Sequence, residues 1–128
     1  MASHKLIALT NPTPGMEQDF EKWYVNTHLP DVLDVPGFKT AQLFKMRPPP
    51  LNVQRMNAPE QPKAGSAPKQ SFSYIAIYDI ETDDLDATWK ILHDRIDTDR
   101  MVISPAFDAT VQPMLLSPVC DVVGPRKK

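Results

Sequence analysis

The chain has 128 residues, of which 41% are hydrophobic and 23% are charged, a length and balance typical of one globular domain. The formal net charge of -2 at pH 7 gives no basic surface that would favour nucleic acid as a partner. Only one cysteine is present, which excludes an internal disulfide and any metal site built from several cysteines.

The sequence carries no signal for export or for insertion into a membrane. No stretch approaches the roughly 20 apolar residues that span a bilayer. The N-terminal residues Met1 to Lys5 lead into only a short apolar run, unlike a secretory signal. We therefore expect a cytoplasmic protein with no membrane partner.

The predicted elements begin with a strand, a helix and a second strand. The apolar run 6–9 predicts a buried strand, and the segment 11–15 after it predicts a turn because it holds two prolines and a glycine. Apolar residues recur at three- and four-residue spacing over 16–27 and predict a helix, whose regular pattern Pro30 is expected to break. The alternating segment 38–46 predicts the second strand.

The second half of the chain begins with a long proline-rich segment. Six of the 14 prolines fall in the segment 48–70, which has no periodicity and predicts a long loop, either a mobile insertion or a lid. Beyond it, the sequence predicts a strand over 71–80, an amphipathic helix over 84–96 and a last strand over 109–116. Pro113 indicates an edge position or a bulge in that last strand.

This order of elements, β-α-β-β-α-β, predicts an α+β fold of ferredoxin-like topology, a four-stranded antiparallel sheet with two helices on one face. The other face needs a cover. We assign to it one parity of the strand 71–80, which carries Phe72, Tyr74, Ala76 and Tyr78. Two such faces packed together predict a homodimer, with aromatic residues that either form only its core or also enclose a small apolar ligand.

Two short segments resemble a known family. Residues 23–30 read Trp-Tyr-Val-Asn-Thr-His-Leu-Pro, and residues 35–38 read Val-Pro-Gly-Phe. This pattern resembles the EthD-like members of the dimeric α/β-barrel superfamily over the first part of the chain, and the remainder is similar only in the order of strands and helices. The resemblance implies one EthD-like domain over residues 1–128, a barrel shared by two subunits, and a cavity between the sheet and the helices of each.

The resemblance also implies a set of reactions. Relatives of this kind include polyketide cyclases, dehydratases and decarboxylases, muconolactone-type isomerases, monooxygenases, and proteins without an assigned role. Most of the non-oxidative members use no cofactor, so none is expected here. They bind a flat or cyclic substrate and move protons with His, Tyr or Asp.

His28 is the leading candidate for a catalytic residue. An imidazole titrates near neutral pH and can therefore take and return a proton, and the resemblance places the family's characteristic histidine here. The alternative is a histidine that ends a helix and hydrogen-bonds a free carbonyl. Tyr24 lies one turn earlier on the same helix face, where it could orient the imidazole or a substrate oxygen.

Five further residues complete the predicted site. Tyr74 and Tyr78 project to the same side of one strand, and their hydroxyls could steady an anionic intermediate in catalysis. Asp31 could hold the tautomer of His28, or it could cap a short turn after the proline. The remaining candidates for substrate binding are Trp23 and Asn26.

The other polar clusters predict no chemistry. His93 and Asp97 share a helix face, but no recognised metal-binding spacing surrounds them, so a charged solvent face is expected there. Cys120 falls in the irregular tail and is expected to be inert.

The sequence leaves three functions open. The leading prediction is a cofactor-free lyase or isomerase that performs proton-transfer chemistry on a small cyclic or aromatic compound. The alternatives are a non-catalytic dimeric binding or accessory protein and a cofactor-independent or haem-linked monooxygenase.

Overall fold

The computed structural model describes residues 2–47, 72–108 and 110–126, so the predicted loop at 48–70 lies outside the described residues. All the strands and helices predicted from the sequence are present, with shifted ends. In chain order the elements are β1 (Ser3–Thr10), α1 (Glu17–Trp23), a π-helical turn η1 (Tyr24–His28), α2 (Leu29–Leu33), β2 (Phe38–Lys45), β3 (Tyr74–Glu81), α3 (Leu85–Arg95) and β4 (Gln112–Leu116).

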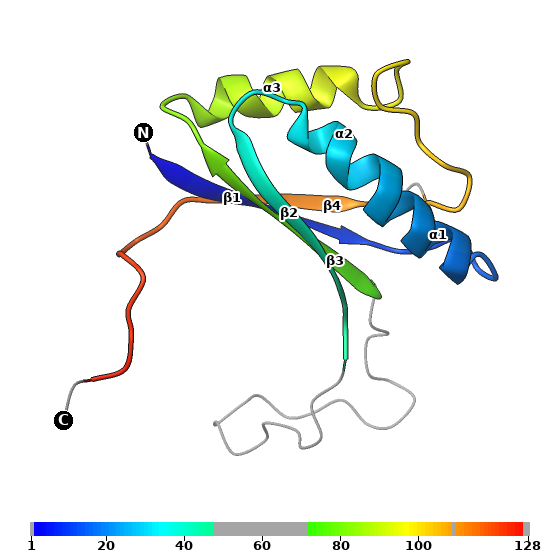
Figure 1. Cartoon of the computed structure of the whole chain (residues 1–128), viewed down its shortest axis with the longest axis horizontal. Helices are drawn as coiled ribbons and strands as arrows, with labels where there is room; N and C mark the ends of the chain where they lie inside the picture. Colours follow the sequence, from blue (N-terminus) through cyan, green and yellow to red (C-terminus); the bar gives the residue numbers. More distant parts are fainter. Residues whose placement is uncertain (1, 48–71, 109, 127–128) are drawn as a thin grey trace.

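The four strands form one antiparallel sheet in the order β2-β3-β1-β4. The helices lie together on one side of this sheet (Figure 1). This arrangement confirms the predicted ferredoxin-like α+β fold. Pro113 lies in β4, which is an edge strand, as its missing backbone N–H indicated.

The face of β3 that meets the helices is the one that carries the tyrosines. Tyr74, Ala76 and Tyr78 are each 0–2% exposed in this single chain. The prediction that these side chains lie on the face away from the helices is therefore wrong. The other side of β3 carries Ile75 and Ile77 and is apolar there too. Alternation alone therefore does not decide which side of the strand is buried.

The face of the sheet away from the helices also carries apolar residues, among them Phe44, together with polar residues such as Gln42 and Asp79. Ile77 of β3 lies opposite Ile7 of β1, which in turn lies opposite Met114 of β4. Ile75 and Leu9 form the next pair along the same face. These five apolar side chains are half-buried or exposed in the single chain, and we call this surface the open face.

The first helical segment passes through Pro30 without a break. Leu29 donates its backbone N–H to the carbonyl of Tyr24, five residues earlier, and this bond defines the π-helical turn η1. Pro30 lies in the first turn of α2, where its missing N–H leaves no donor unpaired. The helix therefore changes its hydrogen-bonding register at Tyr24–His28 and runs on to Leu33, contrary to the predicted break.

The connection from α3 to β4 completes the core. The side chain of Asp84 caps α3 by accepting the N–H of Ala87 at 3.0 Å. Beyond α3, Met101 and Ala106 are 0% exposed and pack into the same core as Leu92. None of the helices in the described part of the chain is long and apolar enough to span a bilayer.

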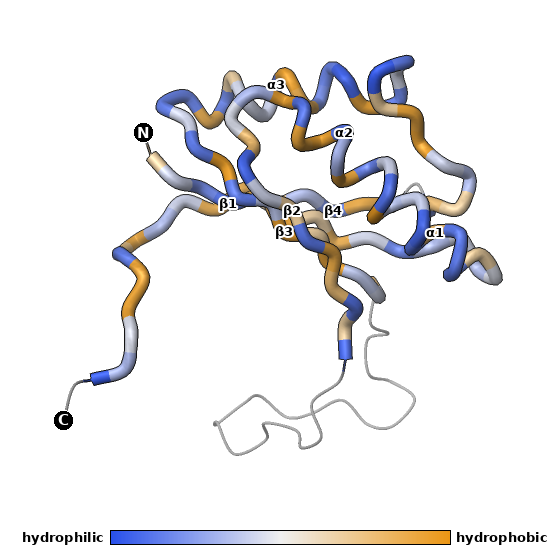
Figure 2. The backbone as a smooth tube through the Cα atoms, in the orientation of Figure 1, coloured by the Kyte–Doolittle hydropathy of each residue, from blue (hydrophilic) through white to orange (hydrophobic). Residues whose placement is uncertain are grey.

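The segment after β4 runs away from the body of the protein (Figure 1), and hydrophobic residues lie along it (Figure 2). Val119 and Val122 are 101% and 102% exposed. Cys120 lies between them as an exposed free thiol.

Candidate active site

A cavity of about 380 Å³ lies between the sheet and the helices. This volume is within the range of small-molecule sites. Buried residues form its floor, which includes Leu6, Tyr24, His28, Tyr78 and Leu92. Exposed residues form its rim, namely Ile96, Asp97, Val111 and Pro113.

His28 reaches the floor of the cavity from the π-helical turn. Its side chain stacks on Trp23 with 4.8 Å between ring centroids, and the ring of Tyr24 meets it edge-on at the same 4.8 Å. Its Nδ1 is sealed from solvent and has no hydrogen-bond partner among the described residues. Burial lowers the pKa of His28 from 6.5 to about 4 because the charged ring loses its hydration. The imidazole is therefore neutral at pH 7 and can accept a proton.

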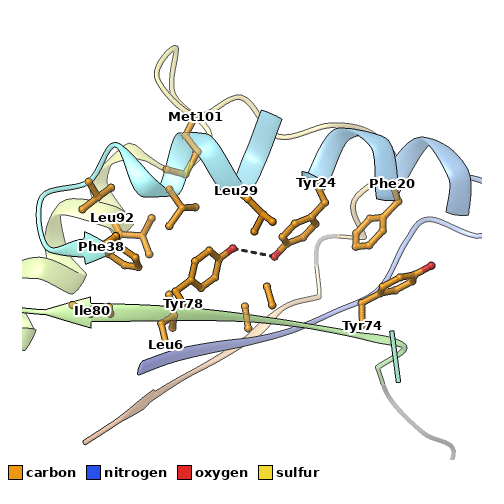
Figure 3. Packing of buried hydrophobic residues seen from close by; sticks show 14 of the residues in the cluster. Leu6, Phe20, Tyr24, Leu29, Phe38, Tyr74, Tyr78, Ile80, Leu92 and Met101 are labelled. Carbon is orange, nitrogen blue, oxygen red and sulfur yellow. Dashed lines mark hydrogen bonds between the residues drawn. The ribbon is translucent and has the colours of Figure 1, made fainter. Parts of the chain in front are cut away.

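Tyr24 and Tyr78 place two phenols beside this imidazole. They come from η1 and β3, and their hydroxyl oxygens point toward each other at 3.4 Å (Figure 3). Burial raises the pKa of Tyr24 to about 12, although its contacts with Tyr78 and Thr10 oppose the shift, and burial also raises the pKa of Tyr78. Both phenols therefore stay protonated. Only one can donate to the other, so the second O–H remains available to a bound molecule.

Thr10 lies behind the two tyrosines. Its Oγ1 is buried and makes no hydrogen bond of normal geometry, although it lies near enough to the Tyr24 hydroxyl to oppose the rise in the pKa of that group. An unpaired buried hydroxyl is uncommon in a native protein. At this end of the cavity, the hydroxyls of Thr10, Tyr24 and Tyr78 therefore do not all hydrogen-bond to one another.

Four of the residues predicted from the sequence do not line the cavity, namely Trp23, Asn26, Asp31 and Tyr74. Tyr74 is buried, and its hydroxyl donates to the carboxylate of Glu21. Burial raises the pKa of Tyr74 to about 12, and the hydrogen bond and negative charge of Glu21 add to the shift. Asn26 is exposed on the helix. Asp31 is partly exposed, and burial together with Asp34 raises its pKa. The fold thus brings together His28, Tyr24 and Tyr78, with Trp23 behind the imidazole.

The sequence analysis did not predict the cavity residues that come from α3 and from the connection between α3 and β4. Trp89 and Leu92 belong to the predicted apolar stripe of α3, which was the available signal. Phe107 comes from the connection to β4, whose sequence has no periodicity that would have predicted a buried position. The centroid of its ring lies 5.6 Å from that of Trp23. Asp97 was expected on a solvent face, but it lies at the rim. Among the described residues, no three His, Cys, Asp or Glu side chains converge to hold a metal ion.

The sequence matches no protein-family model, and no curated protein matches it. Solved structures do match. The haem degrader MhuD from Mycobacterium tuberculosis, with two haems bound, has a TM-score of 0.52 at 17% identity and covers 94% of this chain and 99% of its own. A putative antibiotic biosynthesis monooxygenase from Bordetella bronchiseptica has a TM-score of 0.52 at 19% identity and covers 94% and 100%.

An ethyl tert-butyl ether D (EthD) family protein from Bacillus halodurans also matches, with a TM-score of 0.46 at 17% identity over 91% of this chain and 99% of its own. The likenesses to MhuD and to the Bordetella protein show that the chain has the ferredoxin-like fold. The fold that the resemblance of residues 23–38 implies is thereby confirmed.

The same comparison contradicts the leading functional prediction. Several of the matching structures are named as putative monooxygenases or as a haem degrader. They favour the monooxygenase that the sequence left as an alternative, so the prediction of a lyase or isomerase was wrong.

Proposed function

We propose that this chain is a cofactor-independent monooxygenase that oxidises a small aromatic compound, with His28 as the general base. The observation that carries this proposal is a neutral, buried imidazole that lines an apolar cavity beside two tyrosine hydroxyls. The similar structures named as monooxygenases support the class of reaction.

His28 would remove the proton that activates the substrate. Its pKa of about 4 results from burial, which costs the charged ring its hydration. An organic anion beside the ring favours the imidazolium and raises that pKa again, so proton transfer and anion formation support each other. The free O–H of the Tyr24–Tyr78 pair would donate to the oxygen on which the negative charge develops.

No external reductant is needed if the substrate supplies all the electrons. Anthrone illustrates the balance. His28 takes a proton from the ring methylene, and the resulting anion reduces dioxygen and forms a C–O bond. The O–O bond then breaks, one oxygen stays as the new ketone of anthraquinone, and the other leaves as water with the two methylene hydrogens. One O2 is consumed and one water is released for each turnover.

The cavity does not fit haem. Haem carries two propionates, yet the described residues that line the cavity include neither lysine nor arginine, and Asp97 lies at the rim. Histidine and tyrosine are possible axial ligands, but they leave the two propionate charges without a cationic partner in the described lining. No step is therefore assigned to haem.

We also propose that the chain works as a homodimer joined through the open face. In the single chain this face leaves Ile7, Ile77 and Met114 in one row that is only partly buried. Contiguous apolar surface of this kind is typical of a protein interface. The cavity lies on the other side of the sheet, so its buried floor belongs to one subunit.

The experiment that tests the reaction uses the purified protein without added metal or cofactor. Anthrone and isotopically labelled dioxygen are supplied, and oxygen uptake and product mass are measured against the spontaneous rate. We expect anthraquinone with one labelled oxygen. His28→Phe should lower the rate by about a hundredfold or more, because general base catalysis contributes on that order.

Two tyrosines of β3 provide a matched pair of variants. Tyr78→Phe removes a hydroxyl from the cavity and should slow the reaction by about tenfold or more. Tyr74→Phe removes a hydroxyl that faces Glu21 instead and should leave the rate unchanged. Unlabelled product, or a His28→Phe protein as fast as the wild type, would contradict the proposal.

A further inference from the structure

Asp97 has an unusual backbone conformation at the end of α3. Its φ of 63° makes it the only non-glycine residue with positive φ in the described part of the chain. Aspartate tolerates this left-handed conformation better than most residues do. The backbone N–H of Asp97 donates to the carbonyl of Met101 at 2.9 Å, and the Thr98 hydroxyl donates to the carbonyl of Arg95 at 2.5 Å. The turn that holds Asp97 is therefore well defined.

Asp97 also occupies a distinct place in the cavity. Among the described lining residues it is the only acidic one, and its neighbours on the rim are Ile96, Val111 and Pro113. No salt bridge joins its carboxylate to a cation in the described residues. The cavity thus has two polar ends, a neutral end on the floor at His28 and a carboxylate at the rim, with apolar walls between them.

We propose that Asp97 determines the charge of the ligand that the cavity accepts. It selects neutral aromatic compounds that carry a hydroxyl at the outer end and excludes aromatic carboxylates. This inference rests on the proposed function, because it names the substrate class of the same cavity.

The physical basis is the environment of the carboxylate. A phenolic hydroxyl donates a charge-assisted hydrogen bond to Asp97, which is stronger than a bond between two neutral groups. A ligand carboxylate at the same place meets the like charge of Asp97, and the two charges repel each other. The same end of a ligand is therefore attracted or repelled according to its charge.

Two probes of the same ring system test this selection. Naphthalene-2,6-diol and 6-hydroxy-2-naphthoic acid share one hydroxyl and differ in whether the other end is a hydroxyl or a carboxylate. Their dissociation constants are measured by titration calorimetry at neutral pH. We expect the wild type to bind the diol about tenfold more tightly than the acid.

The variants isolate the charge. Asp97→Asn keeps a residue that tolerates positive φ and removes the charge, so the ratio of the two dissociation constants should fall close to one. Asp99→Asn removes a neighbouring exposed carboxylate that does not line the cavity and should keep the wild-type ratio. Thermal unfolding followed by circular dichroism confirms that each variant is folded.

Each outcome bears on the proposal. Equal affinities of the wild type for the two probes, or an unchanged ratio in Asp97→Asn, would overturn the selection by Asp97 and leave the oxygenase proposal standing, because anthrone carries no carboxylate. Selective binding without anthrone oxidation supports the selection and contradicts only the reaction. Failure of the wild type to bind either probe would overturn the selection by Asp97, whereas the anthrone assay alone decides the oxygenase proposal.

Discussion

Replacing His28 with phenylalanine should change how the stability of the protein depends on pH. His28 is 8% exposed, and burial lowers its pKa from 6.5 to about 4. Above pH 6.5 the ring is neutral in both the native and the unfolded state, so its titration contributes nothing. As the pH falls toward 4, the unfolded chain binds a proton that the native state does not, and the native state loses stability.

The size of this loss follows from the two pKa values. One pKa unit corresponds to about 1.4 kcal/mol. The difference between 6.5 and about 4 is about 2.5 pKa units, so the full loss is about 3 kcal/mol, of which about 2 kcal/mol is reached by pH 5. Phenylalanine cannot bind the proton, so His28→Phe should not show this part of the acid destabilisation. Any change in packing adds a difference that does not depend on pH.

Urea unfolding at about pH 7, 6 and 5 measures the effect. Carboxylates that titrate in this range are common to both proteins, so the difference between wild type and His28→Phe isolates one ring. His93→Gln is the control, because the side chain of His93 is 70% exposed, and this variant should follow the wild type. If wild type and His28→Phe lose stability in parallel from pH 7 to 5, the imidazole is not held neutral by burial.

Two further predictions concern the assembly and one turn. Ile77→Lys places a charge on the open face and should convert the proposed dimer to a monomer in size-exclusion chromatography with light scattering, whereas a wild type that is itself monomeric would contradict the dimer. Gly37→Ala should destabilise the protein by about 2 kcal/mol in urea unfolding, because Gly37 has a φ of 100° and an added Cβ would lie 3.3 Å from the carbonyl oxygen of Glu81. Gly15→Ala is its control, with a φ of 84° but nothing within 4 Å, and should cost about 1 kcal/mol; equal costs would show that the contact contributes nothing.

The order of elements could be predicted because each helix and strand carries its own period. The apolar stripe of Leu85, Trp89 and Leu92 can be recognised from the sequence alone, and it packs on the core as expected. The face of β3 was less clear because both parities are apolar. Asp79 could have indicated which side faces away from the helices, since a carboxylate is seldom placed in a core without a partner. It lies on the open face, bonded to Lys5 and Thr40.

The candidate site was predictable in part. The four-residue spacing of Tyr24 and His28 indicated that the two rings meet, and they do. The π-helical turn that positions them depends on a change of hydrogen-bonding register, which no period in the sequence reveals. Phe107 and Asp97 enter the site through the path of the connection between α3 and β4, and that path is decided by tertiary packing. Residues of this kind are visible only once the fold is known.

The position of β4 has a consequence for how a molecule reaches the buried imidazole. β4 pairs with β1 alone in the described sheet, and Pro113 removes one donor from that pairing. Its side chains are exposed, and Pro113 also stands at the cavity rim. Edge fraying needs far less free energy than global unfolding. Transient fraying of this one strand would therefore open the rim of the cavity, while η1 and β3 hold the proposed catalytic residues His28, Tyr24 and Tyr78.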